Sequence, residues 1–213
     1  MHRPIVPLLI GISIALGVFF LLNLLLGSVP IPLRAICEML LGHEGQPVVW
    51  QNILWKSRVP QALTALVAGA ALSVSGLQMQ TVFRNPLADP SVLGVSAGAS
   101  LGVAFVVLLS GAIGGVALSR LGYLGEIALS VAAILGSLSV LALIVFISTK
   151  VKGNVTLLII GVMIGYVANA IIGVLKFFSV EEDIRAYVIW GLGSFARVSG
   201  DQMLLFVTLM AML

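Results

Sequence analysis

Charged residues are scarce in this chain of 213 residues: Asp, Glu, Lys and Arg make up 9% of it, whereas hydrophobic residues make up 60%. A soluble domain carries roughly 25% charged residues, and a disordered chain needs low hydrophobicity together with high charge. The composition therefore excludes both classes. Uncharged stretches separate Arg3 from Arg34, Arg58 from Arg84, Asp89 from Arg120, Glu126 from Lys150 and Lys152 from Lys176. Because a spanning helix needs about 20 mostly apolar residues, the sequence predicts a polytopic all-α membrane protein.

Residues that bind metals or nucleic acids are also few. Cys37 is the single cysteine, so no disulfide framework or thiolate cluster is expected. His2 and His43 are far apart in the sequence and lack the spacing of metal ligands. A net charge of +3 without a dense basic run argues against nucleic-acid binding. We therefore expect no metal site, no cofactor and no nucleic-acid partner.

Catalytic signatures are missing as well. The sequence contains neither a phosphate-binding P-loop nor the HExxH pattern of metalloproteases. The predicted spans contain no acidic residue, whereas chemistry at membrane depth needs ionisable groups. We expect the chain not to be an enzyme, so that energy for active transport would come from a partner.

The apolar runs predict five spans, two short helices outside the bilayer and the start of a sixth span. The predicted spans are Ile5–Leu26, Pro60–Phe83, Ser91–Leu109, Ile127–Ile147 and Val155–Phe178, the short helices are Leu33–Leu41 and Val180–Trp190, and the sixth run is Gln202–Leu213. Twelve residues make about 18 Å of helix, little more than half a bilayer. We therefore expect a single transmembrane domain, 1–213, that is incomplete at its C-terminal end.

Local signals mark the ends of these helices. Two prolines, Pro86 and Pro90, push the residues before them out of the helical region, which predicts a tight linker after Phe83. Asp89 before Pro90 forms an N-cap and first-turn pair. The sequence from Ser179 to Glu182 matches a capping box for the second short helix.

Glycines recur at helical spacing in the predicted spans. Small residues on one face allow helix backbones to approach closely in a bilayer, so we interpret these glycines as packing residues rather than as chemistry. The set is Gly69, Gly76, Gly94, Gly98, Gly102, Gly161 and Gly165.

The segment Arg58–Gly102 contains a long ordered pattern: R-x-P, then G-A, M-Q, N-P-L-A-x-P, L-G and G-A. The matching residues are Arg58, Pro60, Gly69, Ala70, Met79, Gln80, Asn85, Pro86, Leu87, Ala88, Pro90, Leu93, Gly94, Gly98 and Ala99. This pattern resembles the FecCD-type permeases of binding-protein-dependent ABC importers for iron–siderophores, haem and cobalamin. The resemblance continues more weakly to Phe195.

The resemblance implies a permease subunit of the inner membrane with a ten-span fold, of which this chain would supply five spans and part of a sixth. The implied partners are a separate ATP-binding subunit, a periplasmic or lipoprotein substrate-binding protein, a second permease copy and membrane lipid. The N-terminus and the linker 84–90 would face the cytoplasm, and the segments 28–58 and 179–200 would face outward. Charge alone favours the opposite orientation, with four basic residues inside and seven outside.

The resemblance also assigns roles to individual residues. Lys56, Arg58 and Gln61 would lie where the family docks its binding protein, although Gln61 stands where the family has a second arginine. The alternative is that the two basic residues anchor the helix among lipid headgroups.

Four further residues would border the cytoplasmic end of the translocation path: Gln80, Asn85, Leu87 and Asn154. The path itself would lie at the homodimer interface, lined by the fifth span and the ends of the second and third. The alternative for the linker is a purely structural Asn-Pro turn.

Two other functions stay open. A secondary transporter usually places ionisable residues or interrupted helices at mid-membrane, and the predicted spans contain no acidic residue. The other alternative is a membrane scaffold subunit that does not transport.

Overall fold

The computed structural model describes residues 5–43, 45–112 and 123–195, together with residues 198, 200, 203, 207 and 208. All regular secondary structure in these residues is helical, which confirms the predicted all-α class. The predicted sixth run, Gln202–Leu213, lies mostly outside the described residues.

The chain forms two compact units, residues 1–72 with 194–213 and residues 73–193. Helix α4 (Val59–Phe83) begins in the first unit and ends in the second. A single domain over the whole chain therefore stays a prediction, and each unit is described separately below.

The first unit is built around the end of α1 (Ile5–Leu25) and the short amphipathic helix α2 (Leu33–Leu40), which begins at the predicted residue. Helix α3 (Val48–Ile53) continues through a π-helical turn, η1 (Leu54–Arg58), into α4. Its core consists of Leu24, Ile31, Ala35, Ile36, Met39, Leu54 and Ala62.

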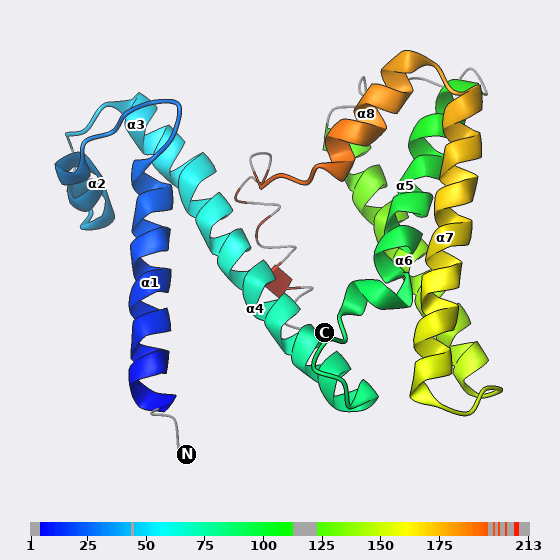
Figure 1. Cartoon of the computed structure of the whole chain (residues 1–213). Coiled ribbons are helices and arrows are strands. Elements are labelled where there is room, and N and C mark those ends of the chain that lie inside the picture. Colours follow the sequence, from blue (N-terminus) through cyan, green and yellow to red (C-terminus); the bar gives the residue numbers. More distant parts are fainter. Residues whose placement is uncertain are drawn as a thin grey trace. The chain divides into compact units, whose positions relative to one another are not determined.

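In the second unit, α5 (Val95–Ala112) packs against α6 (Tyr123–Ser148), α7 (Asn154–Phe178) and α8 (Glu181–Gly191) (Figure 1). A 3₁₀-helix, η2 (Pro90–Leu93), connects the linker after α4 to α5 and also contacts α7. One core lies where α5 meets α7 and α8, and a second lies around the linker. They consist of Val103, Ala104, Val107, Leu108, Ile172 and Tyr187, and of Phe83, Ala88, Leu93, Val140 and Ile144.

Four helical segments of the described residues are long and apolar enough to cross a membrane: Ile5–Leu25, Val48–Phe83, Leu124–Ser148 and Asn154–Phe178. The remaining predicted span differs at its start, because α5 begins at Val95 rather than Ser91. Gly94 adopts a left-handed conformation with φ of 75°, which separates η2 from α5. The apolar part of this helix, Val95–Leu109, is therefore shorter than the others, and the count of five spans stays a prediction.

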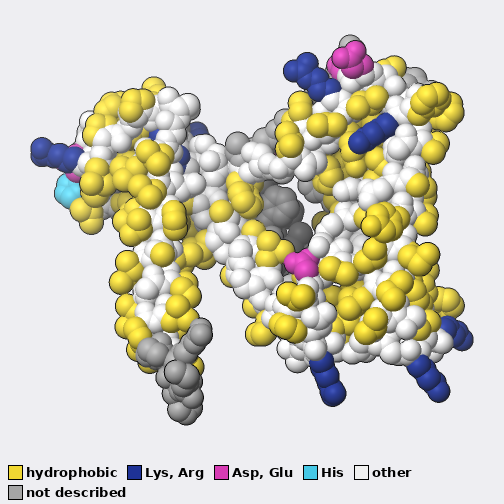
Figure 2. Space-filling model, viewed as in Figure 1, with side chains coloured by type: hydrophobic (Ala, Val, Ile, Leu, Met, Phe, Trp, Pro, Cys, Tyr) yellow, Lys and Arg dark blue, Asp and Glu magenta, His cyan; other side chains and the backbone are white. Residues whose placement is uncertain are grey.

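The helix surfaces suit a lipid environment. Large apolar side chains are widely exposed on α7, with Phe177 at 82%, Phe178 at 73% and Val155 at 70%. On the face shown in Figure 2, Lys and Arg side chains project from the two ends of the second unit, and hydrophobic side chains cover much of the length between them. Water-soluble monomers rarely expose apolar patches of this extent, so these surfaces fit the hydrocarbon region of a bilayer.

The helices of the second unit approach one another through glycines. A Cβ built on Gly98 would lie 2.7 Å from the carbonyl oxygen of Gly136, and one built on Gly102 would overlap the carbonyl oxygen of Ala132. A Cβ on Gly94 would lie 2.8 Å from the carbonyl oxygen of Gly161. Since these neighbours are backbone atoms, they have little freedom to move away. Contact of α5 with both α6 and α7 therefore requires glycine at these positions.

The other predicted packing glycines differ from this group. A Cβ on Gly165 would make only an ordinary contact, 3.8 Å from the Cβ of Ala97. At Gly69 and Gly76, both on α4, a Cβ would meet no described atom within 4 Å. At Gly76, the backbone of α4 is therefore not in close contact with another helix within the part of the chain that the structure describes.

The predicted capping box before α8 is wrong. Val180, not Ser179, is the N-cap residue, and no side chain caps the helix. The hydroxyl of Ser179 instead donates to the carbonyl oxygens of Leu175 at 2.6 Å and Leu108 at 3.2 Å. The Ser179 hydroxyl thus binds the last turn of α7 instead of capping α8, because the last carbonyls of α7 lack partners within the helix.

Glycine substitutions test this packing. Gly98→Ala and Gly102→Ala should each lower the unfolding free energy by about 1–3 kcal/mol, because a methyl group would overpack a backbone contact. Gly76→Ala is the matched control and should be neutral or stabilising by about 0.5–1 kcal/mol, since a Cβ there meets no described atom within 4 Å and alanine favours a helix interior. Thermal unfolding in detergent measures the difference. Equal melting temperatures for Gly102→Ala and Gly76→Ala would contradict the close approach.

Candidate functional site

The linker between α4 and η2 ends α4 through a defined turn. The backbone N–H of Arg84 donates to the carbonyl of Thr81 at 3.3 Å, and that of Asn85 donates to the carbonyl of Gln80 at 3.1 Å. Arg84 has a positive φ of 48°, which a non-glycine residue rarely adopts. The chain therefore reverses direction directly after the helix.

Two polar side chains hold this linker. The Oδ1 of Asn85 accepts from the backbone N–H of Leu87 at 2.9 Å, and the Oδ1 of Asp89 accepts from the N–H of Ser91 at 2.7 Å. Hydrogen bonds from Ser91 keep the pKa of Asp89 below its usual value. Asp89 caps η2 with Pro90 in its first turn, as the sequence predicts. The side chain of Leu87 is left 85% exposed.

Asn154 joins the start of α7 to the end of α4. Its Nδ2 donates to the carbonyl oxygen of Val82 at 2.9 Å. The structure thus brings Asn154 close to the turn that contains Gln80 and Asn85, although it is distant from them in the sequence. Leu87 belongs to the same turn.

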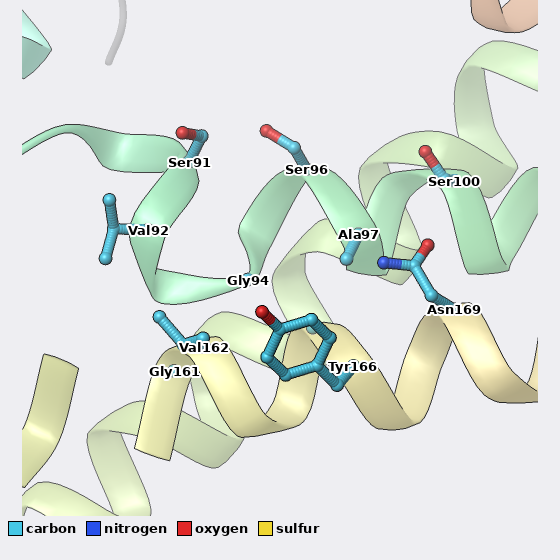
Figure 3. Close-up of a pocket in the computed structure, with 11 residues that line it drawn as sticks. Ser91, Val92, Gly94, Ser96, Ala97, Ser100, Gly161, Val162, Tyr166 and Asn169 are labelled. Atoms are coloured by element: carbon cyan, nitrogen blue, oxygen red, sulfur yellow. The ribbon is translucent and has the colours of Figure 1, made fainter. Parts of the chain in front are cut away.

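A groove of about 430 Å³ runs between α5 and α7 within the second unit (Figure 3). Its lining is formed by η2, the first half of α5 and the facing residues of α7: Ser91, Val92, Gly94, Ser96, Ala97, Ser100, Gly161, Val162, Gly165, Tyr166 and Asn169. All of these side chains are uncharged. The polar groups are three hydroxyls, one phenol and one carboxamide, which can all donate and accept hydrogen bonds.

The groove is linked to α8 through Ser100. Its side chain forms a hydrogen bond with Tyr187, and burial raises the pKa of that tyrosine. The Nζ of Lys176 lies 4.7 Å from the centre of the Tyr187 ring, which is the geometry of a cation–π contact. A residue of the groove therefore bonds directly to the short helix that follows α7.

Sequence reasoning missed the polar residues of this groove. The signal was the i, i+4 spacing of Ser96 and Ser100, and of Val162 and Tyr166 followed by Asn169, in otherwise apolar helices. It also missed that residues 94–98 (GVSAG) match the G-x-S-x-G pattern of hydrolase nucleophile elbows. Such an elbow connects a strand to a helix, whereas Ser96 follows a 3₁₀-helix and lies inside α5. The match therefore does not indicate a hydrolase.

Arg58 occupies a different environment in the first unit. Its side chain is 5% exposed, and Nη1 donates to the carbonyl oxygens of Leu24 at 2.5 Å and Leu25 at 3.1 Å. Its Nη2 donates to the carbonyl oxygen of Val29. A Cβ on Gly27 would lie 2.7 Å from this Nη2, so glycine provides the space for the guanidinium. Arg58 therefore satisfies carbonyls at the end of α1, which have no partners within the helix.

The two other predicted docking residues lie near Arg58 in the sequence. Lys56 is exposed, and the Nε2 of Gln61 donates to the hydroxyl of Ser57 at 2.8 Å. Lys56 thus offers an accessible charge at η1, whereas the guanidinium of Arg58 is occupied by backbone groups. Among the described residues, no group of three His, Cys, Asp or Glu side chains has the arrangement of a metal site.

Known proteins are similar to this chain over nearly its whole length. A model of the FecCD transport family matches residues 14–213. The vitamin B12 import system permease protein BtuC of Klebsiella pneumoniae subsp. pneumoniae is 33% identical over 205 residues, covering 96% of this chain and 56% of BtuC. The hemin transport system permease protein HmuU of Yersinia pestis is 36% identical over 157 residues, covering 73% of this chain and 44% of HmuU.

A solved structure supports the same relationship. It is described as an inward-facing conformation of a metal-chelate type ABC transporter, and it is 26% identical with a TM-score of 0.75. The match covers 97% of this chain and 59% of the solved chain. This chain thus spans about half the length of the relatives that it matches.

Replacement of Arg58 tests whether its hydrogen bonds to the end of α1 stabilise the fold. Arg58→Gln should lower the unfolding free energy by about 2–3 kcal/mol, because the carbonyl oxygens of Leu24 and Leu25 lose their charged hydrogen-bond donor. Lys56→Gln removes a neighbouring exposed charge and should change the stability by less than about 0.5 kcal/mol. Thermal unfolding in detergent compares the two variants. If both variants unfold at the wild-type temperature, the hydrogen bonds of Arg58 do not stabilise the fold.

Proposed function

The chain belongs to the FecCD transport family, and we propose on this premise that it forms the membrane-spanning part of a permease subunit in an ABC importer. The family match over residues 14–213 carries this proposal. The proposed cargo is a cobalamin, haem or iron-chelate type compound. The functions stated in the names of BtuC, HmuU and the solved transporter support this range of substrates.

The proposed location is the inner membrane, with a translocation path between two copies of the permease. The fifth predicted span and the ends of the second and third would line this path. Two features of the structure support the proposal: the long apolar helices and the polar groove on α5 and α7. The energy would come from a separate ATP-binding subunit, because the sequence contains no P-loop.

The proposed outer partner is a substrate-binding protein that docks near η1. The exposed charge of Lys56 supports this location, with Arg58 and Gln61 as its neighbours. Charges at the rim of an interface act mainly on the association rate and are screened by salt. Arg58 would contribute through its charge while its guanidinium stays bound to the end of α1.

The proposed inner gate contains Gln80, Asn85, Leu87 and Asn154. The exposure of Leu87 and the bond between Asn154 and Val82 support this proposal. The linker is held by its own hydrogen bonds, so it would move as one piece when the bond to Asn154 breaks. The full permease fold of ten spans and the homodimer belong to the same proposal.

Reconstitution tests the function. The permease, its ATPase and its binding protein in proteoliposomes should take up cobalamin, haem or a ferric siderophore only when ATP and the binding protein are present. Uptake driven by an ion gradient without the ATPase would instead identify a secondary transporter. Assembly with the ATPase but no uptake of any chelate would identify a scaffold subunit.

Replacement of Asn154 tests the gate. Asn154→Leu removes the hydrogen bond to Val82, so the inner end should open more readily and basal ATP hydrolysis should rise at least twofold relative to uptake. Thr149→Val is the control, because that exposed hydroxyl follows α6 directly and donates to the carbonyl oxygen of Phe146, in the last turn of the same helix. The ratio of ATP hydrolysed to substrate transported measures the effect. A ratio equal to that of the control would refute a role of the Asn154–Val82 bond in the proposed inner gate.

A further inference from the structure

The groove between α5 and α7 differs chemically from the surfaces around it. Tyr166 is 71% exposed, and Asn169 is exposed one turn further along the same helix. Neighbouring exposed residues of α7 are apolar, with Met163 at 61% and Val167 at 60%. A carboxamide and a phenol on a spanning helix are unfavourable against lipid, because hydrocarbon offers no hydrogen-bond partner. This face of α7 is therefore suited to a polar ligand.

The floor of the groove is formed by backbone. Gly94, Gly161 and Gly165 line it together, and the contacts of Gly94 with Gly161 leave no space for side chains between the two helices. The polar groups rise from the two sides of this floor: Ser91 and Ser96 from the η2–α5 side, and Tyr166 and Asn169 from α7 (Figure 3). A ligand lying in the groove would meet hydroxyl and amide groups on both sides.

The charge of the groove limits which chelates it suits. No Lys, Arg, His, Asp or Glu belongs to its described lining. An ionised carboxylate or catecholate that leaves water needs an opposite charge or several strong donors. A neutral amide or hydroxamate needs one donor and one acceptor, which serine, asparagine and tyrosine all provide.

We infer that this groove is a contact site in the translocation path for an uncharged chelate whose periphery carries amide or hydroxamate groups. The inference rests on the proposed function and adds the substrate class and the residues that contact it. Hydrogen bonds between neutral groups are weak in net terms, so a chelate would be guided through the groove and released. A volume of about 430 Å³ falls within the range of small-molecule sites.

Thiol protection tests the site without a need for transport. Ser96→Cys is introduced together with Cys37→Ser in the full permease–ATPase complex, and labelling by a maleimide is timed in detergent. Cyanocobalamin or ferrichrome, both uncharged, should slow labelling at least fivefold at position 96. The matched control, Val167→Cys, is exposed on α7 outside the groove and should not be protected. Haem, which carries two carboxylates, should protect position 96 less than twofold.

A charge introduced into the groove tests the selectivity. Asn169→Lys should shift the ratio of haem to cyanocobalamin uptake at least fivefold toward haem, whereas Met163→Leu should leave the ratio unchanged. Equal protection by haem and the uncharged chelates, or no protection by any of them, would overturn the groove proposal. Protection at position 96 without ATP-driven uptake would retain the groove as a binding site and refute the proposed function. ATP-driven uptake in proteoliposomes without protection of position 96 would retain the proposed function and refute the groove as a binding site.

Discussion

The second unit depends on the close approach of α5 to two neighbouring helices. In lipid no hydrophobic effect drives helices together, so association relies on van der Waals packing between small residues. Gly98 and Gly102 allow α6 to lie against α5, and Gly94 allows α7 to do so on another side. Because α5 also contacts η2 and α8, its position sets the separation of the two sides of the groove. One packing constraint thus determines both the bundle and its candidate site.

A second constraint is the satisfaction of carbonyl groups at helix ends. The chain satisfies these groups with side chains. Arg58 and Asn154, distant in the sequence, bind carbonyls at the ends of α1 and α4, and Ser179, directly after α7, binds carbonyls of α7 and of the distant α5. Each of these bonds fixes a point where an apolar helix meets a turn. The Arg58 bonds hold the end of α1 in the first unit, whereas the Asn154 bond lies at the proposed inner gate. Both sites therefore use the same chemistry: a side-chain N–H donates to a backbone carbonyl oxygen near the end of a helix.

The neutral groove agrees with what a transport path requires. A permease that bound its cargo tightly would not release it, so a few weak hydrogen bonds serve better than an ion pair. Charge in the second unit is instead found toward its ends, where Arg84, Lys150 and Lys152 are exposed near the helix termini. The bond from Ser100 to Tyr187 on α8 adds a direct connection between the groove and the segment that we place on the outer side.

The sequence by itself determined the all-helical class, the approximate positions of most long helices and the family. The fifth predicted span differs from α7 by one residue at its start, and the turn at Asp89–Pro90 forms as expected, because apolar periodicity, proline and capping residues act locally. Tertiary structure decided the rest. Several contacts depend on which helix faces meet: the approach of Gly98 to Gly136, the carbonyls bound by Arg58 and the hydrogen bonds of Ser179. The same holds for the groove, which brings Ser96 and Asn169 together. Local sequence carries no such information, since these partners are mostly far apart along the chain and their contacts form only when the helices pack.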